Sequence, residues 1–526
     1  MATQSSIKAT FKRAASGISE IADNLDLWAD RTAELLQVLE ASHHQGVLDL
    51  AAAIEPHNIG LSAQLSERAE AGIKGCQADG FDFADTDNDL AYCLYWMHNL
   101  PVEFNEAIQA NTFLHAIWPA VVAAAPKPII SAADIAAVQT ANQLPGIVLA
   151  SSDGTVLGTN TYEQFDRGWL WTIVNRYLNW KDGTADFRVR PKPFAPIPLS
   201  PRSDTGTTGV VKIAIIGDWG TGTYPASTEG NGQQAAEVLK TANSLNPDYI
   251  IHLGDTYYAG TGANRPPAGE EKANMVDLWA QLTNGFPAGR FFTLNSNHEM
   301  YGGAYGLYND ALDKPMFAAQ GGTTYFALEY KNWLIGALDS AFYSPSVTYL
   351  KGGLGIMHED QFQYQFLLDF GKYAAAGGMT TMLMSHHNPI TTFADGLFGT
   401  LWDDVTGSGG ITPDYWYWGH IHLAAVYSDK APIWQQLNLT TPPKARCVGH
   451  SAIPVATPWG FSQPQHAGAA TWWAATPKNP PTDNSNVIAQ FAERIKNGFG
   501  MITLTDGGIL EEIYDQDSTT PVWTSR

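Results

Sequence analysis

The chain begins with a long region of helical hydrophobic pattern. From Ile18 to Leu39, apolar side chains recur at steps of three and four residues, which is the period of an amphipathic helix. The same pattern continues to about residue 125, so we predict a mainly helical N-terminal domain over residues 1–125. This region carries no group of reactive side chains. We therefore expect it to act as a cap or to mediate homo-oligomerisation.

The pattern changes twice before residue 210. Apolar positions alternate with a period of two on either side of Asp153-Gly154, which is typical of a β-hairpin, and a tryptophan-rich helical stretch follows. We predict a small α+β segment over residues 126–190. Residues 191–209 then carry five prolines between Pro191 and Pro201, and this composition favours an extended connector.

From residue 210 onward, short apolar runs alternate with Gly-rich turns and helical stretches. The runs VKIAIIGD, DYIIHLGD and RFFTLNSNHE show this alternation. It indicates an α/β fold, in which ligands bind where strands end and loops begin. We predict one α/β domain over residues 210–526.

Potential metal ligands follow five of these apolar runs. The first three runs lead to the oxygen-bearing side chains of Asp218, Asp255 and Asn297. Each of these residues alone could be a helix cap or a turn former. Their repeated position after a strand is a stronger signal, because the ends of parallel strands meet at one edge of a sheet.

The two later runs end in histidines. TMLMSHHNP contains His386 and His387, and YWYWGHIHLA contains His420 and His422. Because successive side chains of an extended segment point to opposite sides, we expect His420 and His422 to face one metal cluster together. By the same argument only one of His386 and His387 is a ligand. Counting from the strand favours His386, whereas counting back from the following proline favours His387.

Composition limits the partners of the chain. Its 526 residues are 44% hydrophobic, which predicts a packed globular protein, and its formal charge is −22. This charge would repel nucleic acid and anionic lipid surfaces, so we expect neither as a partner. A site for an anionic substrate would need positive charge from metal ions.

Cysteine content and hydropathy bear on the compartment. The three cysteines have no CxxC spacing, which argues against a disulfide framework or a structural zinc site. The first residues lack the apolar core of a secretory signal, and the longest apolar run is too short to span a membrane. We expect a soluble, cytoplasmic protein.

The ordered motifs resemble those of the calcineurin-like metallophosphoesterases, and more closely the purple acid phosphatase branch. The resemblance extends from about Val211 to Tyr427 and implies an α/β/β/α sandwich, here preceded by the helical N-terminal region. It also implies a hydrolase that acts on a small-molecule phosphate ester. The motifs that carry it are Gly217-Asp218-Trp219-Gly220, Gly254-Asp255-Thr256-Tyr257-Tyr258, Asn297-His298-Glu299, His386 and Gly419-His420-Ile421-His422.

The resemblance further implies a binuclear metal centre. In most of the superfamily a histidine ligand stands where this chain has Gly220, whereas the purple acid phosphatase branch has a tyrosine that Tyr258 matches. A phenolate suits a trivalent ion, so Fe(III) is implied beside a divalent Fe, Zn or Mn. Tyr257 is one residue short of the pattern, and we expect it to be a packing residue. The implied ligands are Asp218, Asp255, Tyr258 and His422 for the first metal, and Asp255 as a bridge, Asn297, His386 and His420 for the second.

The mechanism implied by the resemblance is in-line attack of a metal-bound hydroxide on phosphorus. His298 is then the catalytic residue that protonates the leaving group or stabilises the phosphoryl oxygens. We predict a phosphomonoesterase of acid phosphatase type. Phosphodiesterase or pyrophosphatase activity on the same centre stays open, as does a non-catalytic scaffold. A nucleotide-binding module is disfavoured, because IAIIGDWGTG matches neither common Gly-rich phosphate-binding motif.

Overall fold

The computed structural model describes residues 184–525, except 205–207, 223–233, 261–268, 284, 346–348, 356–361, 454, 457–460, 462–463 and 478–493. It also describes two short strands, β1 (Val148–Ala150) and β2 (Val156–Gly158). These two strands pair antiparallel, which confirms the strands of the predicted hairpin. The predicted helical domain over residues 1–125 lies outside the described residues.

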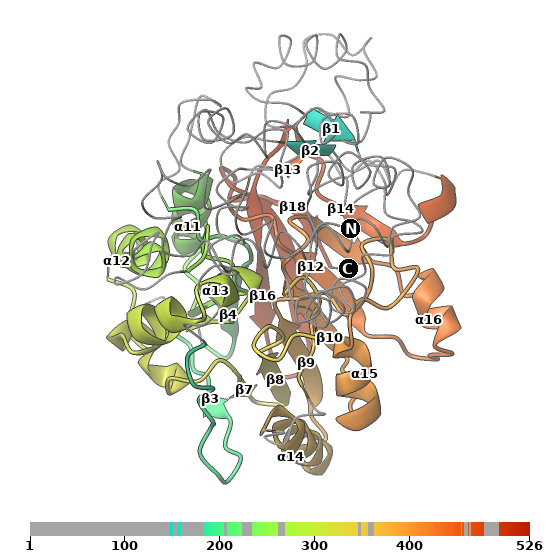
Figure 1. Cartoon of the computed structure of the whole chain (residues 1–526), viewed down its shortest axis with the longest axis horizontal. Helices are drawn as coiled ribbons and strands as arrows, with labels where there is room; N and C mark the ends of the chain where they lie inside the picture. The colour runs from blue at the N-terminus through green and yellow to red at the C-terminus, as the bar shows by residue number, and fades with distance from the viewer. Residues whose placement is uncertain are drawn as a thin grey trace, which may run out of the picture.

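Two β-sheets form the centre of the described structure (Figure 1). The six-stranded sheet has the order β18-β17-β16-β4-β5-β6, and the eight-stranded sheet has the order β14-β11-β12-β10-β9-β8-β7-β3. The strands of the first sheet are β4 (Val211–Ile216), β5 (Tyr249–His252), β6 (Phe291–Thr293), β16 (Gly498–Leu504), β17 (Ile509–Asp515) and β18 (Pro521–Thr524). The strands of the second are β3 (Ile197–Pro198), β7 (Phe326–Tyr330), β8 (Trp333–Leu338), β9 (Thr380–Ser385), β10 (Tyr415–Trp418), β11 (Ala424–Tyr427), β12 (Lys444–Val448) and β14 (Ala470–Trp473). A separate pair joins β13 (Val455–Ala456) to β15 (Arg494–Ile495).

Helices cover the outer face of each sheet (Figure 1). The six-stranded sheet is covered by α11 (Gln234–Ser244), η4 (Glu271–Val276), α12 (Asp277–Leu282), α13 (Asn297–Tyr301), η5 (Leu307–Leu312) and η6 (Pro315–Gln320). The eight-stranded sheet is covered by α14 (Phe362–Gly377), α15 (Leu401–Asp403), η7 (Asp404–Ser408) and α16 (Pro432–Gln436). A short 3-10 helix, η9 (Pro464–His466), completes the set of described helices.

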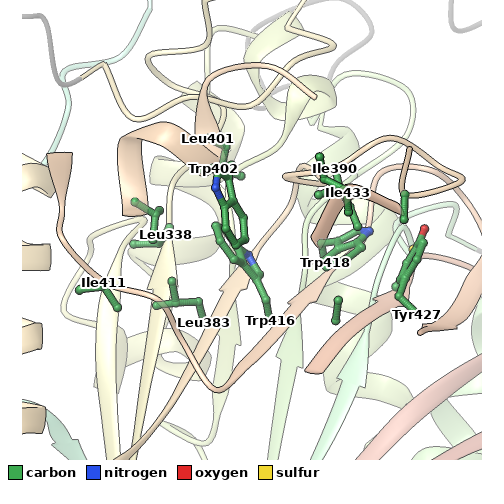
Figure 2. Packing of buried hydrophobic residues seen from close by; sticks show 14 of the residues in the cluster. Leu338, Leu383, Ile390, Leu401, Trp402, Ile411, Trp416, Trp418, Tyr427 and Ile433 are labelled. Atoms are coloured by element: carbon green, nitrogen blue, oxygen red, sulfur yellow. The ribbon is translucent and has the colours of Figure 1, made fainter. Parts of the chain in front are cut away.

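Alternation along the strands builds three hydrophobic layers. In β4, Ile213 and Ile215 pack between the two sheets, whereas Ala214 and Ile216 pack against the helices. On the outer face of the other sheet, Trp402 of α15 stacks on Trp416 of β10 at 5.8 Å between ring centroids (Figure 2). A strand buried on both faces is apolar throughout, which explains the continuous apolar runs of the sequence. The layers therefore follow the order α/β/β/α, as predicted.

Parallel pairing brings the ends of the predicted strands together. Strands β4, β5 and β6 are parallel neighbours, and so are β8, β9, β10 and β12. The loops that leave their carboxyl ends carry the sequence motifs. Strands β7 and β8 form the antiparallel hairpin within TTYFALEYKNWLIGALDS.

Packing on the eight-stranded sheet begins upstream of Val210. Within the Pro-rich connector, Ile197 and Pro198 form β3, which pairs with β7 at the sheet edge. Phe187 and Phe194 pack against the core of the same sheet. The domain boundaries drawn from the sequence stay predictions. Within the described part of the chain, no helix has the length and apolar character needed to cross a membrane.

Candidate metal centre

Three residues from the two sheets form a first donor group. One ligand atom from each of Asp218, Asp255 and His422 lies within 4.8 Å of the others. His422 Nε2 is 3.6 Å from Asp218 Oδ1 and 3.6 Å from Asp255 Oδ2. Both carboxylates are fully buried, and among the described residues their ion pairs are with histidines alone. Two buried carboxylates side by side need a cation or a proton to offset their charge.

The charges of this group act on each other. Burial and the charge of Asp255 raise the pKa of Asp218 well above its usual range. Burial also acts to raise the pKa of Asp255, but the neighbouring His386 and His298 outweigh it and hold this pKa well below its usual range.

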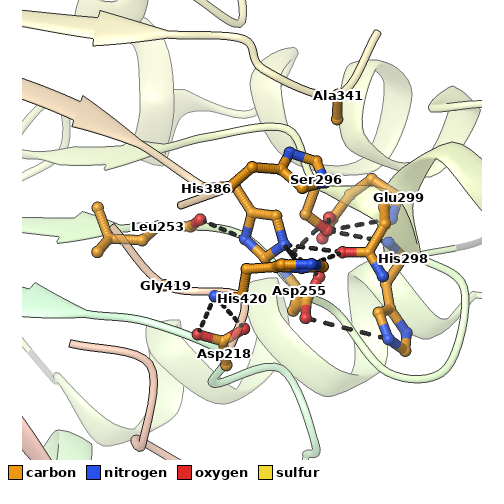
Figure 3. A network of polar contacts seen from close by, with 12 residues as sticks. Asp218, Leu253, Asp255, Ser296, His298, Glu299, Ala341, His386, Gly419 and His420 are labelled. Atoms are coloured by element: carbon orange, nitrogen blue, oxygen red, sulfur yellow. Dashed lines mark hydrogen bonds and ion pairs between the residues drawn. The ribbon is translucent and has the colours of Figure 1, made fainter. Parts of the chain in front are cut away.

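A second donor group contains two imidazole nitrogens and an amide oxygen whose lone pairs face one another with no hydrogen between them. The Nδ1 of His386 is 2.9 Å from the Leu253 carbonyl, and the Nε2 of His420 is 3.0 Å from the Leu350 carbonyl. A carbonyl can only accept, so each of these nitrogens carries the ring hydrogen, and the opposite nitrogen of each ring holds a lone pair. Figure 3 shows the His386–Leu253 contact.

The free nitrogens of these two rings face one another and an amide oxygen. His386 Nε2 and His420 Nδ1 are 3.1 Å apart, and they lie 2.8 and 3.1 Å from Asn297 Oδ1. Burial lowers the pKa of both histidines, so neither ring supplies a second hydrogen. Three acceptors at these distances repel one another unless a cation lies among them. Imidazole nitrogens bound to a carbonyl through their other N–H are the usual arrangement of metal ligands.

Asp255 lies between the two groups. Its Oδ2 faces His422, and its Oδ1 is 3.3 Å from His386 Nε2 and has no hydrogen-bond partner among the described residues. One carboxylate thus presents one oxygen to each group. This is the position that the resemblance implies for a bridging ligand.

Both ring nitrogens of His387 contact groups other than the proposed ligands. Its Nδ1 is 2.9 Å from Ser340 Oγ and its Nε2 is 2.7 Å from the Tyr349 carbonyl. Its ring lies near His386 and His420, and the three are close enough to share an ion. However, both nitrogens of His387 are already engaged, so the geometry favours His386 as the ligand.

Four of these residues have an uncommon backbone conformation that sets the direction of their side chains. Asp218, Asp255, His420 and His422 all have positive φ, at 58°, 75°, 67° and 46°. Such conformations are strained for residues other than glycine and concentrate at functional sites. The segment from His420 to His422 is therefore not extended as the alternation argument assumed, and the two rings face different donor groups that share Asp255. His420 faces the second donor group, and His422 faces the first.

Two glycines make room for this arrangement. A Cβ on Gly419 would lie 2.5 Å from Asp218 Oδ2, and the adjacent His420 N–H donates to both oxygens of that carboxylate at 2.9 Å (Figure 3). A Cβ on Gly220 would lie 2.5 Å from Thr256 Cα. The backbone of the second motif thus fills the space beside Gly220, where an imidazole could not fit without moving it.

The two tyrosines of the second motif differ from the sequence expectation. The hydroxyl of Tyr257 donates to Asp255 Oδ2 at 2.8 Å and lies 2.9 Å from His422 Nε2. Tyr257 is thus a polar member of the first donor group rather than a packing residue alone. Tyr258 is half-buried, and its carbonyl contacts His298 Nδ1. Sequence spacing selected Tyr258 as the ligand and did not identify the contacts of Tyr257. The role of Tyr258 as a ligand stays a prediction.

The third motif, Asn297-His298-Glu299, contacts the backbone of the second motif. Glu299 accepts from the N–H groups of Thr256 at 2.7 Å and of Asp255 at 3.3 Å, so it fixes the backbone that carries Asp255. Ser296 caps α13 by accepting from His298 N, and its hydroxyl donates to Glu299. His298 Nε2 lies 4.0 Å from Asp255 Oδ2, and burial lowers the pKa of this histidine to about 4.

One protein-family model matches part of this sequence. The calcineurin-like phosphoesterase family model matches residues 211–424. No curated protein matches the sequence.

Solved structures with a related arrangement share little sequence with this chain. The Plasmodium protein GAP50, an anchor in the inner membrane complex, has 12% identity and a TM-score of 0.38, over 61% of this chain and 89% of its own. A purple acid phosphatase from yellow lupin (Lupinus luteus) seeds has 14% identity and a TM-score of 0.36, over 61% of this chain and 54% of its own. A dimetal phosphatase from Danio rerio has 13% identity and a TM-score of 0.35, over 58% of this chain and 96% of its own.

Proposed function

We propose that residues 211–424, which match the calcineurin-like phosphoesterase family model, form a binuclear metal-dependent phosphomonoesterase of acid phosphatase type. The observation that carries this proposal is the pair of donor groups that share Asp255. The second group contains three mutually facing acceptors, His386 Nε2, His420 Nδ1 and Asn297 Oδ1, which a cation would stabilise.

The proposed ligands follow from these groups. Asp218, Asp255 and His422 would hold one ion, with a phenol from the second motif as a further ligand. Asn297, His386 and His420 would hold the other, with Asp255 between the two. A phenolate favours a trivalent ion, so Fe(III) beside a divalent Fe, Zn or Mn is the proposed pair. Two such ions would supply positive charge for the phosphoryl group and would lower the pKa of a bound water.

His298 is the proposed proton-transfer residue. Its Nδ1 contacts the Tyr258 carbonyl and carries the ring hydrogen, so its Nε2 holds the lone pair on the side of Asp255. That nitrogen is the atom that would hold a proton for the leaving alkoxide. Glu299 has a different task, because both of its oxygens are used to hold the loop of Asp255.

The substrate preference is proposed as a small phosphate monoester. Diester and pyrophosphate hydrolysis are the alternatives on the same donor groups. The strongly negative chain supports a metal-based site, because a phosphate dianion would otherwise meet net repulsion. A non-catalytic scaffold would not need the buried acceptors described above.

Ligand substitution tests the proposal. We expect Asp218→Asn, Asn297→Ala and His422→Ala each to reduce hydrolysis of p-nitrophenyl phosphate by more than about 100-fold, since second-layer changes at metal sites alone reach about that size. Exposed Asp429, which pairs with Lys444, supplies the matched control Asp429→Asn. Near-normal rates in two of the three ligand variants would contradict the assignment. A panel with bis(p-nitrophenyl) phosphate and pyrophosphate would decide the substrate class.

A further inference from the structure

The loop that follows β8 lies against two histidines of the site at consecutive carbonyl groups. Tyr349 O is 2.7 Å from His387 Nε2, and Leu350 O is 3.0 Å from His420 Nε2. His387 itself is fully buried, and the proposed chemistry gives it no task. Both ring nitrogens of this buried histidine have hydrogen-bond partners, and its neighbour in the chain, His386, is a proposed ligand.

The hydrogen bonds of His387 fix its tautomer. Tyr349 O can only accept, so the ring hydrogen lies on Nε2, and Nδ1 must accept from the Ser340 hydroxyl. The same hydroxyl oxygen accepts from the His387 backbone N–H at 3.1 Å.

The part of the loop beyond Leu350 is anchored independently. Gly353 N donates to Ser340 O at 3.0 Å, and Leu354 N donates to Asp404 Oδ2 at 2.7 Å. A Cβ on Gly352 would lie 2.6 Å from His387 Cβ, so the loop backbone passes directly over this histidine. His387 therefore fixes the loop at the carbonyl next to the one that contacts His420.

The contact with Leu350 decides which nitrogen of His420 faces Asn297. Because Leu350 O accepts from Nε2, the lone pair of His420 lies on Nδ1, toward Asn297 and His386. If the Leu350 carbonyl moved away, the ring would lose both its orientation and its preferred tautomer. Groups that hold metal-ligating histidines in this way affect metal affinity by about 10- to 100-fold.

We infer that His387 is a positioning residue for the second metal ion: it holds the Tyr349–Leu350 carbonyls so that His420 presents Nδ1 as a ligand. This inference rests on the proposed function, because it assumes that His420, His386 and Asn297 hold an ion. It separates His387 from the ligands, although its ring lies close enough to His386 and His420 to share an ion with them.

Two substitutions at His387 separate positioning from ligation. Glutamine places an amide N–H near the position of Nε2 and retains donation to Tyr349 O, whereas asparagine reaches only the position of Nδ1 and loses it. We would titrate metal-free full-length protein with Co²⁺ and follow its visible absorption and the heat of binding, which report both binding steps. Urea unfolding of each metal-free variant would show that it is folded.

The expected result is a second Co²⁺ that binds about 10- to 100-fold more weakly to His387→Asn, with the first ion unchanged, and near-normal binding to His387→Gln. Equal losses in both variants would make His387 a ligand and overturn the inference, and so would normal binding in both. If His387→Asn does not fold, Ser340→Ala removes the hydroxyl that donates to Nδ1 and should weaken the second ion in the same direction. Unchanged binding in Ser340→Ala would then overturn it. A wild-type chain that binds no second ion would instead refute the proposed function.

Discussion

At the scale of single residues, Tyr257 and Tyr258 are one position apart and have different surroundings. The Tyr257 hydroxyl contacts Asp255 and His422, whereas sequence spacing selects Tyr258 as the phenolate ligand. Burial, with the charges of Asp255 and Asp218, raises the pKa of Tyr257 well above its usual range. A highly charged cation at the first donor group would reverse this effect and favour the phenolate.

Iron-loaded protein distinguishes the two tyrosines. We expect Tyr257→Phe to remove the visible absorption of an Fe(III)–phenolate bond and Tyr258→Phe to retain it, because the Tyr257 oxygen is the one placed beside Asp255 and His422. The two variants serve as controls for each other, since both lose one hydroxyl from adjacent positions. The opposite pattern of colours would restore the assignment made from spacing.

The sequence predicted most of the proposed ligands but not how they are aimed. Asp218, Asp255 and Asn297 follow strands whose apolar runs are unmistakable, and parallel pairing brings such positions together. The positive φ values of His420 and His422 have no local signal in the sequence, because non-glycine residues adopt that conformation only uncommonly. The role of Tyr257 was missed for a similar reason, since a motif gives the order of residues and not the turn between them.

At the scale of elements, a buried ion pair joins β12 of one sheet to β17 of the other. Arg446 donates to Glu511 through Nε at 2.8 Å and through a second guanidinium nitrogen at 2.9 Å, and Tyr417 of β10 also donates to Glu511. Both charged side chains are almost fully buried. Removal of one partner would leave the other charged, without a partner and out of water.

Substitutions in this pair should therefore be unequal. We expect Arg446→Met to lower the free energy of unfolding by about 3 kcal/mol, because it leaves the Glu511 carboxylate unpaired. The double variant Arg446→Met with Glu511→Gln should lose clearly less, since no net charge is then buried. Urea unfolding of the single and double variants measures the difference. If the double variant were the less stable one, the pair would not act in this way.

Element prediction succeeded where apolar runs were continuous. Strands β4, β5, β6, β9 and β10 lie in the predicted runs. The Pro-rich segment was expected to be a connector, yet Ile197 and Pro198 pair with β7. Proline is compatible with an edge strand, because the missing N–H can face away from the neighbouring strand.

At the scale of the whole molecule, bound metal should stabilise the fold. A bound cation would offset the repulsion among the buried acceptors around Asn297 and between the carboxylates of Asp218 and Asp255. At an ion concentration of about 100 times the dissociation constant, one site would add about 2.7 kcal/mol to the free energy of unfolding. Thermal unfolding before and after dialysis against a chelator should show a lower midpoint without metal, restored when metal is added back. An unchanged midpoint would count against tight binding.

Buried neutral histidines should make the metal-free protein sensitive to acid. Burial lowers the pKa of His252 to about 3, and that of His450 to about 3 as well. Below about pH 6.5 an unfolded histidine binds a proton, whereas these folded ones do not. The free energy of unfolding must therefore fall as the pH decreases from about 6.5 toward about 3.

His252→Asn tests this sign. Asparagine can retain the contact that His252 Nδ1 makes with Thr293 Oγ1 at 3.0 Å, but it does not titrate. Between about pH 5 and pH 6, the slope of unfolding free energy against pH should decrease by about 1 kcal/mol per pH unit relative to the parent protein. The same slope in both proteins would mean that His252 takes up its proton in the folded state.

The order of strands in the six-stranded sheet has a consequence for biosynthesis. Strand β4, which leads to Asp218, has β5 on one side and β16 on the other, and β16 comprises Gly498–Leu504. During translation β4 thus leaves the ribosome nearly three hundred residues ahead of one of its two neighbours. Until those late residues emerge, one edge of β4 has no partner, so the nascent chain carries an exposed strand edge that chaperones or premature association could engage.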